Sequence, residues 1–206
     1  MQFENILPED IERRSFEIIT EELGDVALDP VQAPIIKRVI HTTADFDYLN
    51  TLCFSEAGVE KLQEALRRGA SIVTDTQMAK AGINKKVLEK YGGRVYCFMG
   101  DEDVARSAAE NGTTRAVAGM DKAAGLSEKL IFAVGNAPTA LIRLYELIEQ
   151  GKISPEGIIG VPVGFVNVEA AKELIMQCKL PYIVARGRKG GSNVAAAVCN
   201  ALLYAL

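Results

Sequence analysis

The chain has 206 residues, of which 49% are apolar and 24% are charged, as is typical of a soluble globular protein with one core. The net charge of −4 argues against general nucleic-acid binding, because that function needs a basic face. Tryptophan is absent and other aromatic residues are few, so platforms for stacking bases are not expected either. We therefore expect a single domain over residues 1–206 that binds no nucleic acid.

The four cysteines are far apart and form no CxxC pair or Cys/His spacing, so a metal site is not expected. The chain is also too long and too apolar to need disulfide staples. Residues 1–10 lack the pattern of a signal peptide, and no apolar run approaches the roughly 18 residues of a membrane span. We expect a cytoplasmic protein with reduced thiols that binds no membrane.

The first 30 residues predict a helical arm, which Pro8 can begin and Gly24 ends. A second helix is predicted from Val31 to about His41, with a proline in its first turn, where proline is tolerated. After Ser55, helical and strand patterns alternate.

Five short apolar runs predict strands at 70–74, 94–98, 130–134, 157–161 and 182–185. Helical patterns lie at 60–68, 84–91, 103–111, 113–123, 137–150, 168–178 and 192–206. The strands are continuous apolar runs, as expected where helices cover both faces of a sheet. The predicted fold is therefore α/β: a doubly wound, mostly parallel, five-stranded sheet with helices on both faces and an N-terminal helical arm.

Ligands of an open parallel sheet bind beyond the carboxyl ends of its strands. In this sequence those ends carry glycine and small polar residues, which let backbone N–H groups approach a ligand. Thr74, Asp75 and Asn136 are candidate contacts there, and each also fits the simpler role of a helix cap. From the residues alone, Arg115 is either a surface cation or a clamp for a carboxylate, and Ser15 is an ordinary hydroxyl on a helix surface.

The last strand end is the most informative one. Arg186, Arg188 and Lys189 fall within four residues, and Gly190-Gly191-Ser192 follows at a helix start, where free N–H groups favour anions. This pattern predicts an acidic ligand, and the alternative is a solvated basic turn. The loop has no Walker A spacing and no strand end has GxGxxG, so a nucleotide is not favoured.

His41 is the only histidine in the sequence, so any acid–base chemistry by an imidazole must involve this residue. Arg38 precedes it by three residues and Asp45 follows it by four, which would place all three on one face of a helix. Arg38 could then hold an anion, while Asp45 orients the ring and favours its charged form. The alternative is a surface histidine with an ion-pair neighbour.

Four segments together resemble the signature segments of precorrin-8X methylmutases, a family that includes cobalt-precorrin-8 enzymes. They read IKRVIHTTADF (36–46), VGNAPTA (134–140), GVPVGFVNV (160–168) and RGRKGGS (186–192). The resemblance implies an isomerase that moves a methyl group from C11 to C12 of a corrin-type ring, giving hydrogenobyrinate or cobyrinate, with no cofactor. It implies that His41 is catalytic, that Ser15, Arg38 and Arg115 contact the substrate, and that two copies form a homodimer with the site near their interface.

Such a substrate is a flat, mostly apolar ring edged with carboxylates, to which arginines are well suited. As a hypothesis, His41 acts as general acid beside the migrating methyl and lowers the barrier to a 1,5 shift. The alternatives are a tetrapyrrole carrier without chemistry and a nucleotide- or phosphate-binding enzyme. Whether the substrate carries cobalt stays open. The predicted substrate-binding set is Ser15, Arg38, Asp45, Thr74, Asp75, Arg115, Asn136, Arg186, Gly187, Lys189, Gly190, Gly191 and Ser192.

Overall fold

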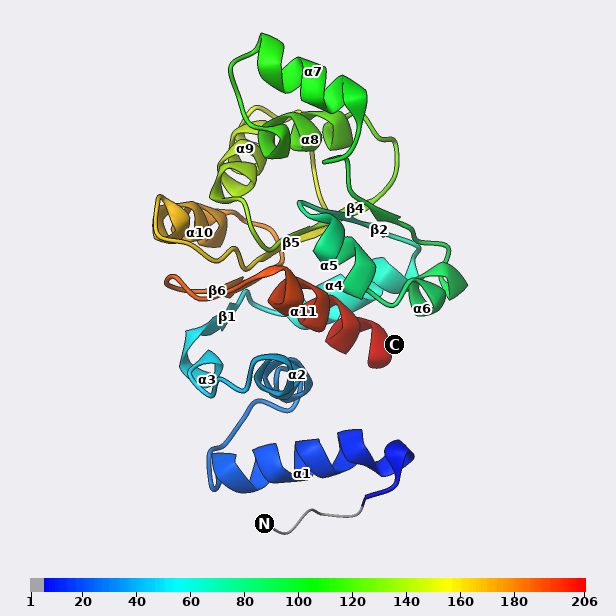
Figure 1. Cartoon of the computed structure of the whole chain (residues 1–206), viewed down its shortest axis with the longest axis vertical. Coiled ribbons are helices and arrows are strands. Elements are labelled where there is room, and N and C mark those ends of the chain that lie inside the picture. Colours follow the sequence, from blue (N-terminus) through cyan, green and yellow to red (C-terminus); the bar gives the residue numbers. More distant parts are fainter. Residues whose placement is uncertain (1–5) are drawn as a thin grey trace.

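The computed structural model describes residues 6–206 and contains a six-stranded sheet between two layers of helices (Figure 1). The strands are β1 (Leu52–Phe54), β2 (Ser71–Thr74), β3 (Val95–Tyr96), β4 (Leu130–Val134), β5 (Gly157–Gly160) and β6 (Tyr182–Ala185). Their order is β1-β6-β5-β4-β2-β3, and only β1 is antiparallel to its neighbour. From β2 the chain runs outward to β3 and then returns to β4 on the other side of β2, so the predicted doubly wound α/β fold is confirmed.

The predicted number of five strands is wrong, because β1 was missed. This strand has three residues and lies at an edge, paired with β6. It follows directly on a short helix, α3 (Tyr48–Thr51), so no periodic pattern marks it in the sequence. A second short helix, α5 (Gln77–Gly82), was also missed, and β3 has only two of the five residues predicted at 94–98.

The other predicted helices are confirmed, with ends within two residues of those expected. A 3-10 turn, η1 (Pro8–Asp10), leads into the N-terminal arm. The remaining helices are α1 (Ile11–Leu23), α2 (Ala33–Thr43), α4 (Gly58–Arg67), α6 (Lys85–Lys90), α7 (Glu102–Glu110), α8 (Arg115–Ala124), α9 (Pro138–Glu149), α10 (Val168–Gln177) and α11 (Ser192–Tyr204).

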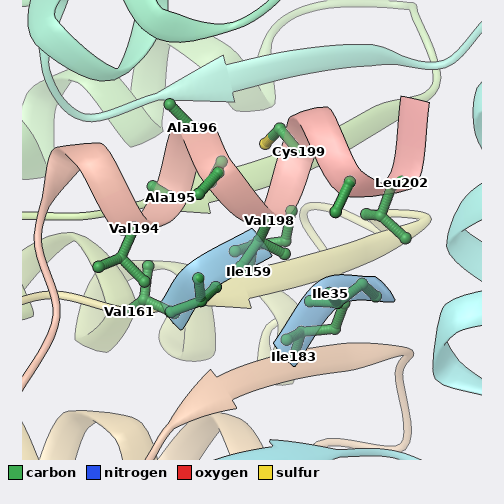
Figure 2. Close-up of a cluster of buried hydrophobic side chains, with 14 of the residues drawn as sticks. Ile35, Ile159, Val161, Ile183, Val194, Ala195, Ala196, Val198, Cys199 and Leu202 are labelled. Atoms are coloured by element: carbon green, nitrogen blue, oxygen red, sulfur yellow. The ribbon is translucent and has the colours of Figure 1, made fainter. Parts of the chain in front are cut away.

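Alternate strand residues face two separate cores, as the period of a strand requires. Ile131 and Ile159 lie in the core covered by α2, α4, α5 and α11, whereas Phe132 and Ile158 lie in the core under α8, α9 and α10. Figure 2 shows α11 laid across β5, with Val194, Ala195 and Val198 close to Ile159 and Val161. Small side chains on α11 allow this close approach, and it is fully buried over most of its length.

The N-terminal arm α1 is the outermost layer and packs on α2 rather than on the sheet (Figure 1). It buries only Ile19 and Leu23. All four cysteines are free thiols. Within residues 6–206, no helix has the length and apolar character needed to cross a bilayer.

Candidate functional site

His41 lies in the last turn of α2 and its ring stacks on Phe16 of the N-terminal arm, with centroids 5.2 Å apart and planes at 18°. Arg38, one turn earlier, places its guanidinium 4.7 Å from the Phe16 ring centroid and 5.3 Å from that of Tyr204 in α11. Arg38 is also ion-paired with Glu12. Residues from three helices that are far apart in sequence therefore hold the predicted histidine and arginine together.

The cavity beside His41 has a volume of about 290 Å³ and lies between α2, α5 and α11. The His41 side chain is exposed. Within residues 6–206 its ring stacks on Phe16 and its side chain makes no hydrogen bond or ion pair. Its ring nitrogens are therefore available to a ligand. The lining residues are Arg38, His41, Thr42, Gly82, Asn193, Ala196, Ala197, Asn200 and Tyr204.

Sequence reasoning missed Phe16 and Tyr204 as parts of this site. Phe16 is visible in the sequence only as one member of an apolar stripe, and Tyr204 as one residue of a long C-terminal helix. No local pattern links either of them to Arg38, because the contact depends on how α1, α2 and α11 pack.

The expected pairing of Asp45 with His41 is wrong. Helix α2 ends at Thr43, and Ala44 takes a left-handed conformation (φ 53°) that turns the chain away from the helix axis. Asp45 instead accepts a hydrogen bond from Lys189 at 2.7 Å. This contact holds the pKa of the Asp45 carboxyl below its ordinary value. The i, i+4 argument fails because the helix does not reach position 45.

The basic loop, residues 186–191, lies where the sequence placed it, but its cations are not free. Each has a carboxylate partner on another element, and all three side chains remain about half exposed, so these pairs are weak and open to exchange with an acidic ligand. The contacts are Arg186 with Glu173 at 3.0 Å, Arg188 with Glu169 at 2.9 Å, and Lys189 with Asp45 at 2.7 Å and Asp47 at 3.2 Å.

The glycines of the basic loop allow it to approach β5 closely. Gly191 N–H donates to the carbonyl of Val161 at 2.9 Å. A Cβ on Gly190 would lie 2.1 Å from the same oxygen, so only glycine fits there. Ser192 begins α11 and its hydroxyl lies 2.8 Å from that of Thr76. Because Asn193 follows directly and lines the cavity beside His41, the basic loop and that cavity are neighbours.

The predicted contacts after β2 and β4 form the framework of the site. Asp75 is 1% exposed, and its carboxylate accepts the backbone N–H groups of Gly135, Asn136 and Ala137 at 2.7–2.8 Å. Burial raises the pKa of Asp75, and these three donors act in the opposite direction. Thr74 is equally buried and its hydroxyl lies 3.1 Å from the carbonyl oxygens of Thr76 and Tyr96.

The expectation that backbone N–H groups at 135–137 face a ligand is therefore wrong. They lie at the point where the sheet order reverses, which is the usual anion site of this fold. Asp75 already fills that position with a carboxylate, which argues against a phosphate or nucleotide there. Of the predicted groups at this edge, only the Asn136 side chain stays exposed.

Arg115 and Ser15 differ in their relation to His41. Arg115 is the first residue of α8, which lies across the sheet from α2 (Figure 1), so one chain does not bring it to the cavity beside His41. Ser15 precedes Phe16 in α1, and its hydroxyl donates to the carbonyl of Ile11 at 2.9 Å.

An exposed apolar surface adjoins the basic loop. It is formed by the apolar loop, residues 162–167, in which Phe165 is 83% and Val166 78% exposed. The Arg188 guanidinium lies 5.8 Å from the Phe165 ring centroid, and Gly164 N–H donates to the Arg188 carbonyl at 3.2 Å. Cations and apolar side chains thus lie side by side at this edge, which suits a ligand that is both apolar and acidic.

Comparison with known proteins covers nearly the whole chain. The model of the precorrin-8X methylmutase family (CbiC) matches residues 10–205. A cobalt-precorrin-8 methylmutase from Salmonella typhimurium is 47% identical over 205 residues and covers 97% of this chain and 96% of its own length. A cobalt-precorrin-8 methylmutase from Priestia megaterium is 43% identical over 197 residues and covers 96% of this chain and 88% of its own. The solved structure of a precorrin-8X methylmutase from Thermus thermophilus matches with a TM-score of 0.86 and 38% identity over 95% of this chain and 96% of that one.

Proposed function

The chain belongs to the precorrin-8X methylmutase family, and on that premise we propose that it is an isomerase that moves a methyl group from C11 to C12 of a precorrin-8 ring. Relatives at 47% and 43% identity are named for the cobalt-containing substrate, which supports the cobalt form of the ring as the substrate and cobyrinate as the product. The cobalt is then part of the substrate, and the enzyme needs no cofactor of its own.

The observation that carries the proposal is the exposed His41 ring, held by Phe16 at the mouth of a cavity and free of hydrogen bonds within residues 6–206. His41 donates a proton or a hydrogen bond to the conjugated ring beside the migrating methyl group. The C11–methyl bond breaks as the C12–methyl bond forms, and the proton returns to His41, so atoms and electrons balance within one substrate. General acid assistance of this kind contributes about 10²–10⁴ in rate.

The rest of the ring lies outside the cavity. A volume of about 290 Å³ holds only one edge of a four-ring macrocycle. The remaining edge extends over the start of α11, where the basic loop offers cations for its carboxylates and the apolar loop offers Phe165 and Val166 for its faces. Under this proposal the substrate contacts are Ser15, Arg38, Asn136, Arg186, Gly187, Lys189, Gly190 and Ser192, while Asp45, Thr74, Asp75 and the buried Gly191, whose N–H already donates to Val161, hold those groups in place.

A homodimer in the cytoplasm completes the proposal. In a single chain, Phe165 and Val166 of the apolar loop leave an apolar face exposed to solvent. A second copy covers that face and supplies its Arg115, which a single chain keeps away from its own His41. Size-exclusion chromatography with light scattering tests the dimer, and a protein that remains monomeric at every concentration with full activity contradicts it.

Visible absorption spectroscopy tests the reaction, with wild type compared to His41→Asn and to the exposed control Lys86→Asn. Wild type and the control should convert cobalt-precorrin-8 to the corrin chromophore, and kcat/KM should be higher for this ring than for metal-free precorrin-8. His41→Asn should still shift the spectrum on binding but lose about 10²–10⁴ in kcat.

Each contrary result has a distinct meaning. A spectral shift without conversion by wild type would identify a tetrapyrrole carrier instead of an isomerase. Turnover by His41→Asn within about twofold of wild type would remove His41 from the chemistry, because a lost general acid costs far more than this.

A further inference from the structure

Lys172 of α10 is a fully buried lysine, with 0% of its surface exposed. Its ammonium donates to the carbonyl of Gly187 at 2.7 Å and to that of Lys189 at 2.8 Å. Both acceptors belong to the basic loop, and no carboxylate lies within ion-pair distance of Lys172 in residues 6–206. A buried lysine without an ion pair is rare.

These two carbonyls are placed so that Lys172 fixes the conformation of the basic loop. Gly187 takes a left-handed conformation (φ 79°), and the chain bends at residues 187 and 188. The Arg188 carbonyl, which lies between the other two in the sequence, accepts the N–H of Gly164 in the apolar loop at 3.2 Å. The backbone of the basic loop is thus hydrogen-bonded both to α10 and to the apolar loop.

One face of α10 contacts the basic loop. Glu169, Lys172 and Glu173 are spaced i, i+3 and i+4, which brings them to the same side of the helix. The two glutamates reach Arg188 and Arg186 through exposed ion pairs, which contribute little. The buried ammonium is therefore the strongest of these contacts, because charge-assisted hydrogen bonds gain strength away from water.

A charged lysine at this position has a cost in stability. Burial lowers the pKa of Lys172 to about 8, and nearby Glu169 offsets this only in part, so the charged side chain makes the folded state less stable at neutral pH. An apolar side chain would pack here without that cost. What an apolar side chain cannot do is bind the two carbonyls.

We propose that Lys172 is a positioning residue, which holds the carbonyls of Gly187 and Lys189 and so presents the basic loop to the carboxylates of the substrate. Lys172 itself does not touch the ring. This inference rests on the proposed function for its catalytic consequence, but the effect on the loop is independent of any activity.

Limited digestion with trypsin measures the loop directly, because Arg186, Arg188 and Lys189 are all potential cleavage sites. The variant is Lys172→Met, and the matched control is Lys179→Met, which removes one lysine from the exposed segment after α10. Cleavage within 186–189 should be at least about tenfold faster in Lys172→Met than in wild type or the control, as expected if one charged contact is lost. KM for cobalt-precorrin-8 should rise by about tenfold, with a smaller change in kcat, because His41 lies on α2.

Lys172→Gln serves as a second variant, and decides the question alone if Lys172→Met does not fold. Its amide keeps two N–H donors without the charge, so cleavage and KM should lie between those of wild type and Lys172→Met. A lower melting temperature with unchanged loop cleavage and unchanged KM would mean a purely structural role and would overturn the proposal. Faster cleavage with unchanged KM would overturn it too, since the substrate would not depend on the loop. Absence of turnover in wild type would refute the proposed function. The cleavage comparison would still show whether Lys172 holds the basic loop, because it does not depend on turnover.

Discussion

Replacing Asp75 by asparagine removes the charge that organises the strand ends. Its Oδ1 accepts the N–H of Gly135 at 2.8 Å, and its Oδ2 accepts those of Asn136 and Ala137 at 2.8 and 2.7 Å. An amide has one oxygen, so Asp75→Asn points an NH₂ group at one or two of these donors.

The expected loss of stability follows from those contacts. A buried donor without a partner costs about 1–3 kcal/mol, and the hydrogen bonds that remain lose the extra strength of a charged acceptor. The asparagine avoids the cost of burying a charge, the effect that raises the pKa of Asp75, so the net destabilisation should be near 2 kcal/mol, as an order of magnitude. For a chain of this size that corresponds to a melting temperature lower by about 4–8 °C.

Thermal unfolding followed by circular dichroism measures this effect. Asn136→Ala is the matched control, because it alters the side chain in the same loop but keeps the backbone N–H that Asp75 accepts, and it should shift the unfolding free energy by less than about 0.5 kcal/mol. A melting temperature of Asp75→Asn within 1 °C of wild type (roughly the effect of a neutral surface substitution) would refute this account of the strand ends.

Three further predictions concern single residues. The pKa of Lys172 is lowered to about 8, so the folded state holds fewer protons than the unfolded state between about pH 8 and 10.5. In urea unfolding, the free energy of unfolding of wild type relative to Lys172→Met should therefore rise by about 3 kcal/mol over that pH range. A difference that does not change with pH would contradict the lowered pKa. Phe16→Leu should lower kcat by about tenfold with little change in stability, because His41 loses its stacking partner while an apolar side chain remains; steady-state kinetics with unchanged kcat would show that the stacking does not orient His41. Gly190→Ala should cost about 1–3 kcal/mol in chemical denaturation, because its Cβ would lie 2.1 Å from the Val161 oxygen, whereas Gly125→Ala, with its nearest atom at 3.4 Å, should cost far less.

Elements whose pattern is local were predicted correctly. The four long strands are apolar runs because both of their faces are buried, and burial on both faces leaves a direct mark in composition. Arg38 and His41 share one face of α2 because helical spacing alone places them there. The family resemblance, drawn from four separate segments, is confirmed by comparison over nearly the full chain.

Elements that depend on distant partners were not predictable in this way. β1 is a strand only because β6 lies beside it, and its three residues carry no pattern of their own. Asp45 fails as a partner of His41 because Ala44 ends the helix in a left-handed conformation, which the sequence does not signal. Its contact with Lys189 depends on the basic loop at the far end of the chain.

The sequence by itself determined the order of the longer strands and helices along the chain, the place of the single histidine one turn after Arg38 and the place of the basic loop, because each follows from spacing over a few residues. Only the tertiary structure decided which groups are free to meet a ligand. The cations of the basic loop are ion-paired, and the backbone N–H groups after β4 donate to Asp75. Lys172 is buried beneath the basic loop, although its place in an amphipathic helix does not distinguish it from a surface lysine. The partners of these side chains come from segments that are far apart in the sequence and come into contact only when the helices pack on the sheet. Local periodicity along the chain does not predict such contacts.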